Sequence, residues 1–479
     1  MSDLAAKLKE RRSAAAERIS ARFKQGKHDV DMTEGSIVKC LFWFALPLLL
    51  GNLFQQLYNM VDTWVIGQTG ENGAYAAVGS VGPIINILIG FFSGLASGAG
   101  VVISQYFGAK KEKEVHDAVH TAVHMTLVLA VIFTILGVLL APVMLDLMLQ
   151  SDGTESEVFP FAKTYLTIYF AGVSGLMIYN MGSGILRAVG DSTRPFIFLL
   201  VSAVTNTALD LLFVFVFKMG VAGVALATVI AQMLSATLTV ITLLKTDSCV
   251  KVHIRDIKVH KEMLSKTIKV GIPAAIQMAI TAFSNVFVQG YIAGIDGNQT
   301  FNLGGWTSYT KLDQFIFLPV QSLALSATTF VAQNLGVGDV KRAKKGTTTA
   351  YIMATSITAA VIAIVMLLAR PLATIFNPDE NVVAVAVKLL LFITPFYLFC
   401  PVNQVFSAAL RGAGESKAPM FIMLGSFVAF RQVYLFVMSN YISNALIPIA
   451  MSYPAGWFVC CVSTLIYYSR FRFGKKKVI

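Results

Sequence analysis

Charged side chains are scarce in this chain of 479 residues, where Asp, Glu, Lys and Arg together make up 13% of the sequence. Soluble domains carry about 25% of such residues, so most of the surface is expected to face something other than water. Hydrophobic residues account for 56% and gather in runs long enough to cross the roughly 30 Å hydrocarbon core of a bilayer. The backbone in lipid must satisfy its own hydrogen bonds, and the short alternating segments of a membrane β-barrel are not seen. The sequence therefore predicts an all-α integral membrane protein.

The five cysteines show neither the spacing of metal ligands nor a disulfide framework, and we expect them to pack inside the protein. They are Cys40, Cys249, Cys400, Cys460 and Cys461. A phosphate-binding loop of the form GxxxxGK[ST] is also missing, which argues against ATP hydrolysis by this chain. The net charge of +12 arises from Lys and Arg at the ends of apolar runs, which suits membrane topology better than nucleic-acid binding. We expect no organic cofactor, no metal centre and no nucleic-acid partner.

The apolar runs predict twelve membrane-spanning helices. They lie at approximately 37–66, 76–106, 116–147, 158–187, 195–217, 221–245, 263–294, 304–334, 344–371, 381–410, 418–438 and 443–469.

Basic residues are concentrated in alternate loops between these spans. Lys110, Lys341 and the basic loop 246–262 lie on one side, whereas the loops 67–75 and 295–303 on the other side carry no Lys or Arg. An excess of Lys and Arg marks the cytoplasmic side of a membrane protein. We therefore predict a multi-pass protein of the cell (inner) membrane with both termini in the cytoplasm.

Residues 1–30 form a separate basic segment. Leu4, Leu8, Ile19 and Phe23 fall on one helical face, with Lys and Arg around the rest. This pattern suits a basic amphipathic helix that lies on an anionic membrane surface. A solvated, partly disordered tail is an equally good interpretation.

The two halves of the chain resemble each other. Three pairs of positions match at nearly one offset: 94–108 with 322–336 (offset 228), 186–195 with 410–419 (offset 224), and Pro47 with Pro273 (offset 226). Each half holds six spans, so both begin on the same side, as in transporters built from parallel repeats. We predict an N-lobe at 31–245 and a C-lobe at 263–479 around a central cleft, joined by a cytoplasmic linker at 246–262.

A few ionisable residues lie deep within predicted spans, where each costs about 2.5–3.5 kcal/mol on insertion scales and so needs a reason. Asp62 lies in the first span, Asp210 follows Asn206 by one turn in the fifth, and Thr228 lies in the sixth. Two carboxylates with amide and hydroxyl oxygens can hold a proton or a sodium ion. The alternative is that they are hydrogen-bonded packing groups. We favour the cation site, because Asn or Ser would serve packing at lower cost.

Other polar residues of the N-terminal half are candidates to line a substrate cavity. They are Gln55, Tyr58, Asn59 and Asn180. In the C-terminal half, the charged candidates are Lys311, Asp313 and Arg431. A structural bridge and a contact with substrate are both open for these three.

Pro47, which lacks an N–H group, should bend the first span and is a candidate hinge. Gly90, Gly94 and Gly98 form a ridge of small residues that predicts close helix packing. His116, His120 and His124 lie on one face of the third span. Their spacing allows metal ligation, but we favour solvated or packing histidines.

Segment 47–62 resembles the first helix of the multidrug and toxic compound extrusion (MATE) transporters of bacterial type. Segments 186–191, 206–210 and 410–414 are similar to the repeated signatures of that family, and the resemblance runs from about Met32 to the last span. It implies a two-lobed antiporter that exports small amphipathic, often cationic, organic compounds in exchange for Na⁺ or H⁺. It also implies a monomer surrounded by membrane lipids.

The resemblance assigns roles to particular residues. Those that match the N-lobe cation site of one bacterial branch are Asp62, Asn206, Asp210 and Thr228, and Pro47 matches the proline at which the first helix bends. Other branches carry carboxylates in the seventh and tenth helices. This chain has Gln277, Thr281, Cys400 and Asn403 there, which argues against coupling through the C-lobe.

Two other functions remain as alternatives. A lipid-linked oligosaccharide flippase of related fold is expected to have a more cationic cavity and, in some cases, two further spans. An integral membrane transferase needs catalytic acids in a loop near the interface. The acids of the loop after the third span, Asp152, Glu155 and Glu157, lack such spacing, so the chain is not expected to be an enzyme.

Overall fold

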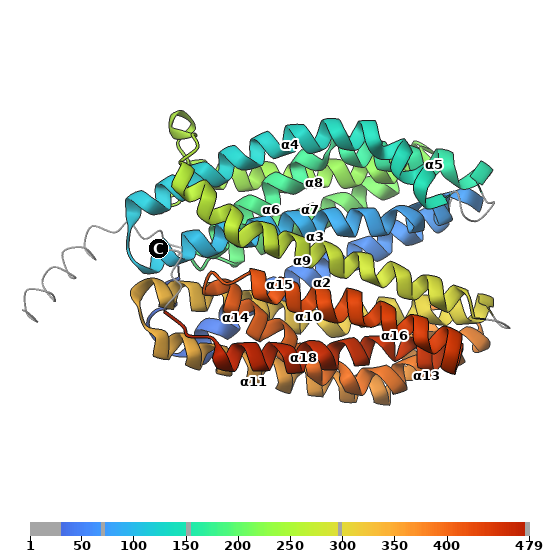
Figure 1. Ribbon diagram of the computed structural model, residues 1–479. Coiled ribbons are helices and arrows are strands. Elements are labelled where there is room, and N and C mark those ends of the chain that lie inside the picture. The colour runs from blue at the N-terminus through green and yellow to red at the C-terminus, as the bar shows by residue number, and fades with distance from the viewer. Residues whose placement is uncertain (1–29, 69–71, 150–154, 296–298, 475–479) are drawn as a thin grey trace, which may run out of the picture.

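The computed structural model describes residues 30–68, 72–149, 155–295 and 299–474, and helices run through almost all of this part (Figure 1). Residues 1–29 of the predicted basic helix lie outside it. The first half comprises α2 (Ile37–Gly67), α3 (Asn72–Gly108), α4 (Glu112–Leu149), α5 (Glu155–Ala171), α6 (Val173–Ala188), α7 (Thr193–Leu211) with the π-turn η1 (Leu212–Val216), and α8 (Gly220–Lys245). A linker with the short 3₁₀ turn η2 (Ile254–Asp256) leads to the second half.

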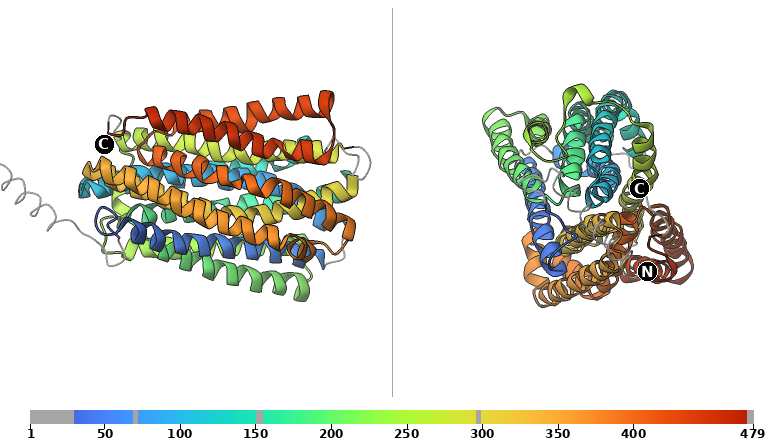
Figure 2. Two further views of the ribbon diagram at one scale, coloured as in Figure 1. Left: turned by 90° about the horizontal axis from the view of Figure 1, so that it is seen from below. Right: turned by 90° about the vertical axis from the view of Figure 1, so that its left-hand side faces the viewer.

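The second half contains more breaks. It comprises α9 (Lys261–Ala293), α10 (Gln299–Val337), α11 (Val340–Leu367), α12 (Ala369–Phe376), α13 (Glu380–Ile393), η3 (Thr394–Phe399), η4 (Val402–Phe406), α14 (Ser407–Gly412), α15 (Lys417–Met423), η5 (Leu424–Phe430), α16 (Arg431–Val437), η6 (Met438–Ile442), α17 (Leu446–Ala450) and α18 (Ser452–Arg470). Seen end-on, the cyan and green helices of the first half lie above the orange and red helices of the second half, and the blue α2 reaches down beside the orange ones (Figure 2, right).

The helices match the predicted spans. In the described part of the chain, ten helices or continuous helix runs are long and apolar enough to cross a membrane, and the bent pair α5–α6, with an angle of 48° between its members, makes an eleventh. The remaining predicted span corresponds to α9, which is 33 residues long. The prediction of an all-helical, two-lobed membrane protein is confirmed.

Helix α2 contributes to the hydrophobic cores of both lobes. Near its start, Leu41 and Phe44 are buried in a cluster with Leu323 and Phe330 of α10. Near its end, Val65 belongs to a different cluster formed by helices of the first half. Pro47 lies between these two parts, next to Leu48, which still belongs to the first cluster.

Helix α9 makes the reciprocal crossing, which Figure 1 shows as a diagonal path between the lobes. Ala275 is buried among residues of the first half, whereas Val288 and Ile292 are buried in the core of the second half. The small-residue ridge on α3 permits this contact: a Cβ atom on Gly94 would lie 2.3 Å from the Cα atom of Ala275. The predicted close packing at this ridge is confirmed.

A pair of crossed hydrogen bonds joins the lobes at the ends of α3 and α10. The side-chain Nε2 of Gln105 donates to the carbonyl of Gly412 (2.9 Å), and Nε2 of Gln333 donates to the carbonyl of Ala188 (3.0 Å). Both donors and both acceptors are related by the sequence repeat, so one contact is the counterpart of the other. We call these two bonds the crossed lock.

Two glycines allow the crossed lock to form. A Cβ atom on Gly108 would lie 2.0 Å from the carbonyl oxygen of Gln333, and one on Gly336 would lie 2.1 Å from that of Gln105. A neighbouring cavity between α3, α6 and α10 has a volume of only about 20 Å³. The lobes are therefore closely packed at this end, which carries the basic loops and which we call the basic end.

Candidate functional site

Two carboxylates that lie far apart in the sequence meet inside the N-lobe. Asp62 on α2 is 6% exposed and Asp210 on α7 is fully buried. Their carboxyl groups are close enough to interact directly. Because both side chains are buried, solvent screens the two charges weakly and each carboxylate strongly affects the other.

Several polar atoms at this site have no hydrogen-bond partner in the described part of the chain. They are Oδ1 of Asp62, both carboxylate oxygens of Asp210, and Oδ1 and Nδ2 of Asn206. An unsatisfied buried polar group costs about 1–3 kcal/mol. Because most of these atoms are oxygens, the donor set fits a small hard cation such as Na⁺, and the carboxylates also fit a proton. The residues present are therefore compatible with the coupling ions that the resemblance implies.

Thr228 on α8 lies at the edge of the carboxylate pair. Its hydroxyl donates to the carbonyl of Val224 (3.0 Å), and it also bonds the hydroxyl of Tyr165 on α5, which faces Asp62 and Asp210. The four residues predicted as a cation site, from α2, α7 and α8, are thus gathered in one region.

Tyrosines surround the carboxylates. Tyr58 lies one turn before Asp62 and hydrogen-bonds to Gln55 on the same helix. Tyr169 lies one turn after Tyr165 and accepts a hydrogen bond from Gln232 Nε2 (3.4 Å). The aromatic faces and hydroxyls give the site both apolar and polar surface.

Sequence reasoning missed Tyr165, Tyr169 and Gln232. A signal was present, because Tyr165 precedes Tyr169 by four residues and Thr228 precedes Gln232 by four, so each pair shares a helical face. Tyrosine and glutamine are ordinary residues in transmembrane helices, however, and neither pair identifies a site without the partner helix.

The other two cavity candidates have different environments. Asn59 is exposed, and its carbonyl accepts a bond from the hydroxyl of Thr63 (2.9 Å). Asn180 donates to the carbonyl of Leu176 (2.9 Å) and accepts from the hydroxyl of Ser93 on α3 (3.1 Å). Asn180 therefore ties α6 to α3.

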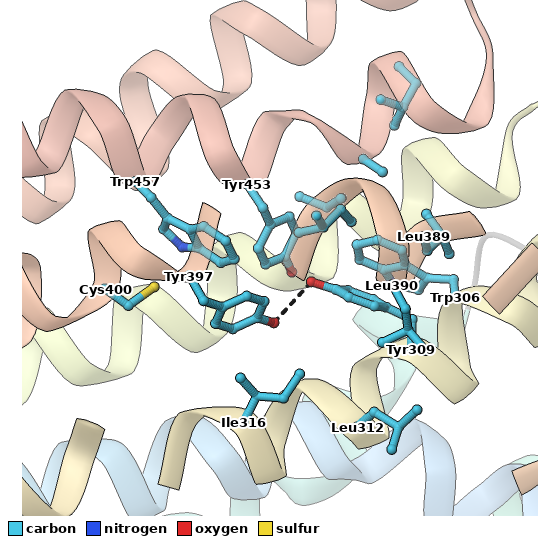
Figure 3. Packing of buried hydrophobic residues seen from close by; sticks show 14 of the residues in the cluster. Trp306, Tyr309, Leu312, Ile316, Leu389, Leu390, Tyr397, Cys400, Tyr453 and Trp457 are labelled. Atoms are coloured by element: carbon cyan, nitrogen blue, oxygen red, sulfur yellow. Dashed lines mark hydrogen bonds between the residues drawn. The ribbon is translucent and has the colours of Figure 1, made fainter. Parts of the chain in front are cut away.

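A second polar cluster lies in the C-lobe core, where the hydroxyls of Tyr309 and Tyr397 point toward each other (Figure 3). Tyr397 donates to the carboxylate of Asp313, and its hydroxyl lies 3.1 Å from that of Tyr309. The guanidinium of Arg431, whose side chain is 1% exposed, stacks at 4.3 Å on the ring of Tyr453. Asp313 and Arg431 also attract each other across this cluster, so both are built into the aromatic core.

Arg431 is held by further contacts with α9. Its Nη1 donates to Oδ1 of Asn285 (3.1 Å) and lies 3.4 Å from Oγ of Ser284. These contacts favour the structural role that the sequence left open for Arg431. Lys311 has a different environment, in a pocket of about 420 Å³ that it lines together with Thr307, Ser308 and Asn377 among others.

The residues at the positions of the C-lobe carboxylates in other branches take part in helix packing. Oε1 of Gln277 accepts from Arg411 (3.4 Å), and Nδ2 of Asn403 donates to the carbonyl of Trp457 (3.1 Å). Thr281 donates to the carbonyl of Gln277 (2.8 Å). The acidic pair of the N-lobe therefore has no counterpart in these contacts.

Comparisons with known proteins identify the family. The family model described as MatE matches residues 47–212 and 273–437, once in each half. The chain is 28% identical over 452 residues to the probable multidrug resistance protein YoeA of Bacillus subtilis, covering 92% of this chain and 95% of that protein. It is 24% identical over 402 residues to the multidrug export protein MepA of Staphylococcus aureus, and the match covers 82% of this chain and 86% of that protein.

Solved structures share the fold. A transporter of the MOP superfamily from Pyrococcus furiosus superimposes with a TM-score of 0.86 at 22% identity, covering 93% of this chain and 98% of that one. At this identity the likeness establishes the arrangement of the helices and nothing finer.

Proposed function

Because the chain belongs to the MatE family and is a multidrug efflux transporter of that family, we propose that it works as an antiporter coupled to Na⁺ or H⁺. Its substrates are small amphipathic, often cationic, organic compounds. The observation that carries this proposal is the buried pair Asp62 and Asp210, of whose four carboxylate oxygens three have no hydrogen-bond partner in the described part of the chain.

The carboxylate pair is suited to exchange a cation. Two neighbouring carboxylates in an apolar site cannot both remain charged at low cost without a proton or a metal cation between them. Tyr58 and Tyr165 place aromatic surface beside these carboxylates, and aromatic faces together with acidic groups attract organic cations. The ion and a cationic drug therefore compete for the same negatively charged site.

Alternating access follows from the way α2 is packed. Ion binding at Asp62 acts on the end of α2 in the N-lobe, and the start of α2 is packed in the C-lobe beyond Pro47. A change in the shape of α2 at Pro47 would alter the contact between the lobes. Because a ligand shifts an equilibrium only through its different affinity for the two states, the ion must bind more tightly in the state that releases the drug. Each chain contains the whole site, so the working unit is a monomer.

Transport in proteoliposomes tests the proposal. We expect Asp62→Asn and Asp210→Asn each to abolish export of a cationic dye driven by an imposed Na⁺ or H⁺ gradient, because a single carboxylate no longer forms the pair that requires the cation. Separate Na⁺ and H⁺ gradients identify the coupling ion.

The matched control is Asp146→Asn, which removes an exposed carboxylate from α4 of the same lobe and should leave export unchanged. All variants must reach the membrane at similar levels. Full export by both Asp62→Asn and Asp210→Asn would refute the coupling role of the pair.

A further inference from the structure

A cluster of histidines joins α4 to the linker between the lobes. His116 and His120 lie four residues apart on α4, His253 precedes the turn η2, and Asp256 ends it. One ligand atom from each of these four residues lies within 4.8 Å of all the others. The sequence indicated solvated or packing histidines on α4, because it did not reveal that two residues from the linker approach the same face.

The geometry brings the side chains of the linker toward His116. Its Nε2 lies 3.6 Å from Oδ2 of Asp256, and its ring centroid lies 5.9 Å from that of His253. The backbone N–H of Asp256 donates to the carbonyl of His253 (2.9 Å). This turn holds the two linker side chains on the same side.

His120 supports the cluster as a positioning residue. Its Nε2 accepts the backbone N–H of His253 (2.9 Å), and its Nδ1 lies 2.7 Å from the carbonyl of His116. Both ring nitrogens are therefore engaged, and the buried ring fixes the backbone at His253.

Asp117 provides a carboxylate behind His116. Its Oδ1 lies 3.7 Å from Nδ1 of His116 and 3.4 Å from Nε2 of His260. Carboxylates on this side of ligating histidines recur in metal sites, where they orient the ring, and Asp117 stands on that side of His116 at ion-pair distance.

We propose that His116, His253 and Asp256 bind one divalent transition-metal ion such as Zn²⁺. Two imidazoles and a carboxylate form a three-ligand set that leaves a coordination position for water. Imidazole selects transition metals over Mg²⁺ and Ca²⁺, which prefer oxygen ligands only. His253 and Asp256 are exposed, so an ion can reach the site from solvent.

The bound ion ties the linker to the N-lobe. The linker already packs there through the buried residues Val250 and Val252, and the N–H of His260 donates to Oγ1 of Thr121 on α4 (3.1 Å). Helix α9 begins at Lys261 and crosses to the C-lobe. The metal therefore fixes the segment from which the crossing helix starts.

Metal titration of the full chain in detergent, purified through a tag without histidine, tests the site. With Zn²⁺ in competition with a chromophoric chelator, we expect one equivalent to bind. His116→Ala and His253→Ala should each weaken binding by about tenfold or more, since even the loss of an outer partner of a metal ligand costs 10- to 100-fold. His124→Ala, one turn after His120 on α4 and outside the cluster, is the control and should bind like the unmodified chain.

Two further measurements separate this site from misfolding and from the cysteines. Asp256→Asn changes an exposed side chain, so it should keep the unfolding temperature measured with EDTA while weakening Zn²⁺ binding. Co²⁺ at the site should show a spectrum of nitrogen and oxygen ligands without thiolate bands. The proposal is wrong if the chain binds no equivalent of Zn²⁺, or if the His116→Ala, His253→Ala and Asp256→Asn variants bind as the unmodified chain does. Because no transport is measured, the result is independent of the proposed antiport.

Discussion

Single residues of the N-lobe differ in how directly they act on the carboxylate pair. Asp62 and Asp210 carry the charge, whereas the hydroxyl of Tyr165 bonds Thr228 and lies within electrostatic reach of both carboxylates. The hydroxyl of Tyr165 can therefore be removed without removing charge, which makes it a sensitive probe of the site.

We expect Tyr165→Phe to keep export but to raise the ion concentration needed for half-maximal exchange by about 2- to 12-fold. This range corresponds to the roughly 0.5–1.5 kcal/mol that one hydrogen bond contributes. The measurement is dye efflux against a series of ion concentrations. Tyr351→Phe, on α11 of the C-lobe, should leave the ion dependence unchanged, and an unaltered dependence in Tyr165→Phe would remove this tyrosine from the site.

The acidic residues were predictable from the sequence, and the tyrosines around them were not. A carboxylate in an apolar helix is conspicuous because its burial is costly, so the sequence alone was enough to propose that Asp62 and Asp210 form one site. Burial of Tyr165 and Tyr169 carries no such cost, since an aromatic ring is equally compatible with lipid, a protein core or a cavity. Only the packing of α5 against α8 gives them a position near the carboxylates.

For whole helices, too, the sequence predicted the local structure but not which helices pack together. The apolar runs predicted the membrane spans, and the internal repeat predicted two lobes. The crossings of α2 and α9 between the lobes could not be predicted, because hydrophobic periodicity states that a face is buried but not what covers it. For α2, the change of partner occurs around Pro47.

We expect Pro47→Ala to reduce export on the order of tenfold, equal to about 1.4 kcal/mol in the barrier, while leaving equilibrium drug binding nearly unchanged. Alanine restores the hydrogen bond that proline cannot make, so α2 resists bending. Turnover in proteoliposomes and spin-label distances along α2 measure the two effects. Pro142→Ala in α4, a proline inside a helix of one lobe, should not slow export. If Pro47→Ala exports at the normal rate, bending at this proline is not needed.

Across the whole molecule, the crossed lock holds the two lobes together at the basic end. Gln105 and Gln333 are both almost fully buried, and each reaches the opposite lobe. In the proposed alternating access the lobes move as units, so that opening this end would break both bonds together.

We expect the double substitution of leucine for Gln105 and Gln333 to favour the state that is open at the basic end. Two hydrogen bonds contribute about 1–3 kcal/mol, which corresponds to roughly a 5- to 150-fold change in the population ratio. The measurement is the rate at which a thiol reagent labels Thr329→Cys, beside the small inter-lobe cavity, in a chain whose other cysteines have been replaced. This rate should increase in the double variant by a factor in the same range. Gln314→Leu, an exposed position on α10, is the control, and unchanged labelling in the double variant would show that the lock does not hold the lobes.

The two glycines that face carbonyl oxygens across the lobes set a stricter requirement than the hydrogen bonds do. A side chain on Gly108 or Gly336 would overlap the opposing backbone, so the crossed lock could not form without a displacement of that backbone. When such a variant opened its other end, the path would be continuous through the membrane. One added methyl group would then let ions cross without exchange. We therefore expect proteoliposomes containing Gly108→Ala to dissipate an imposed ion gradient without any drug present.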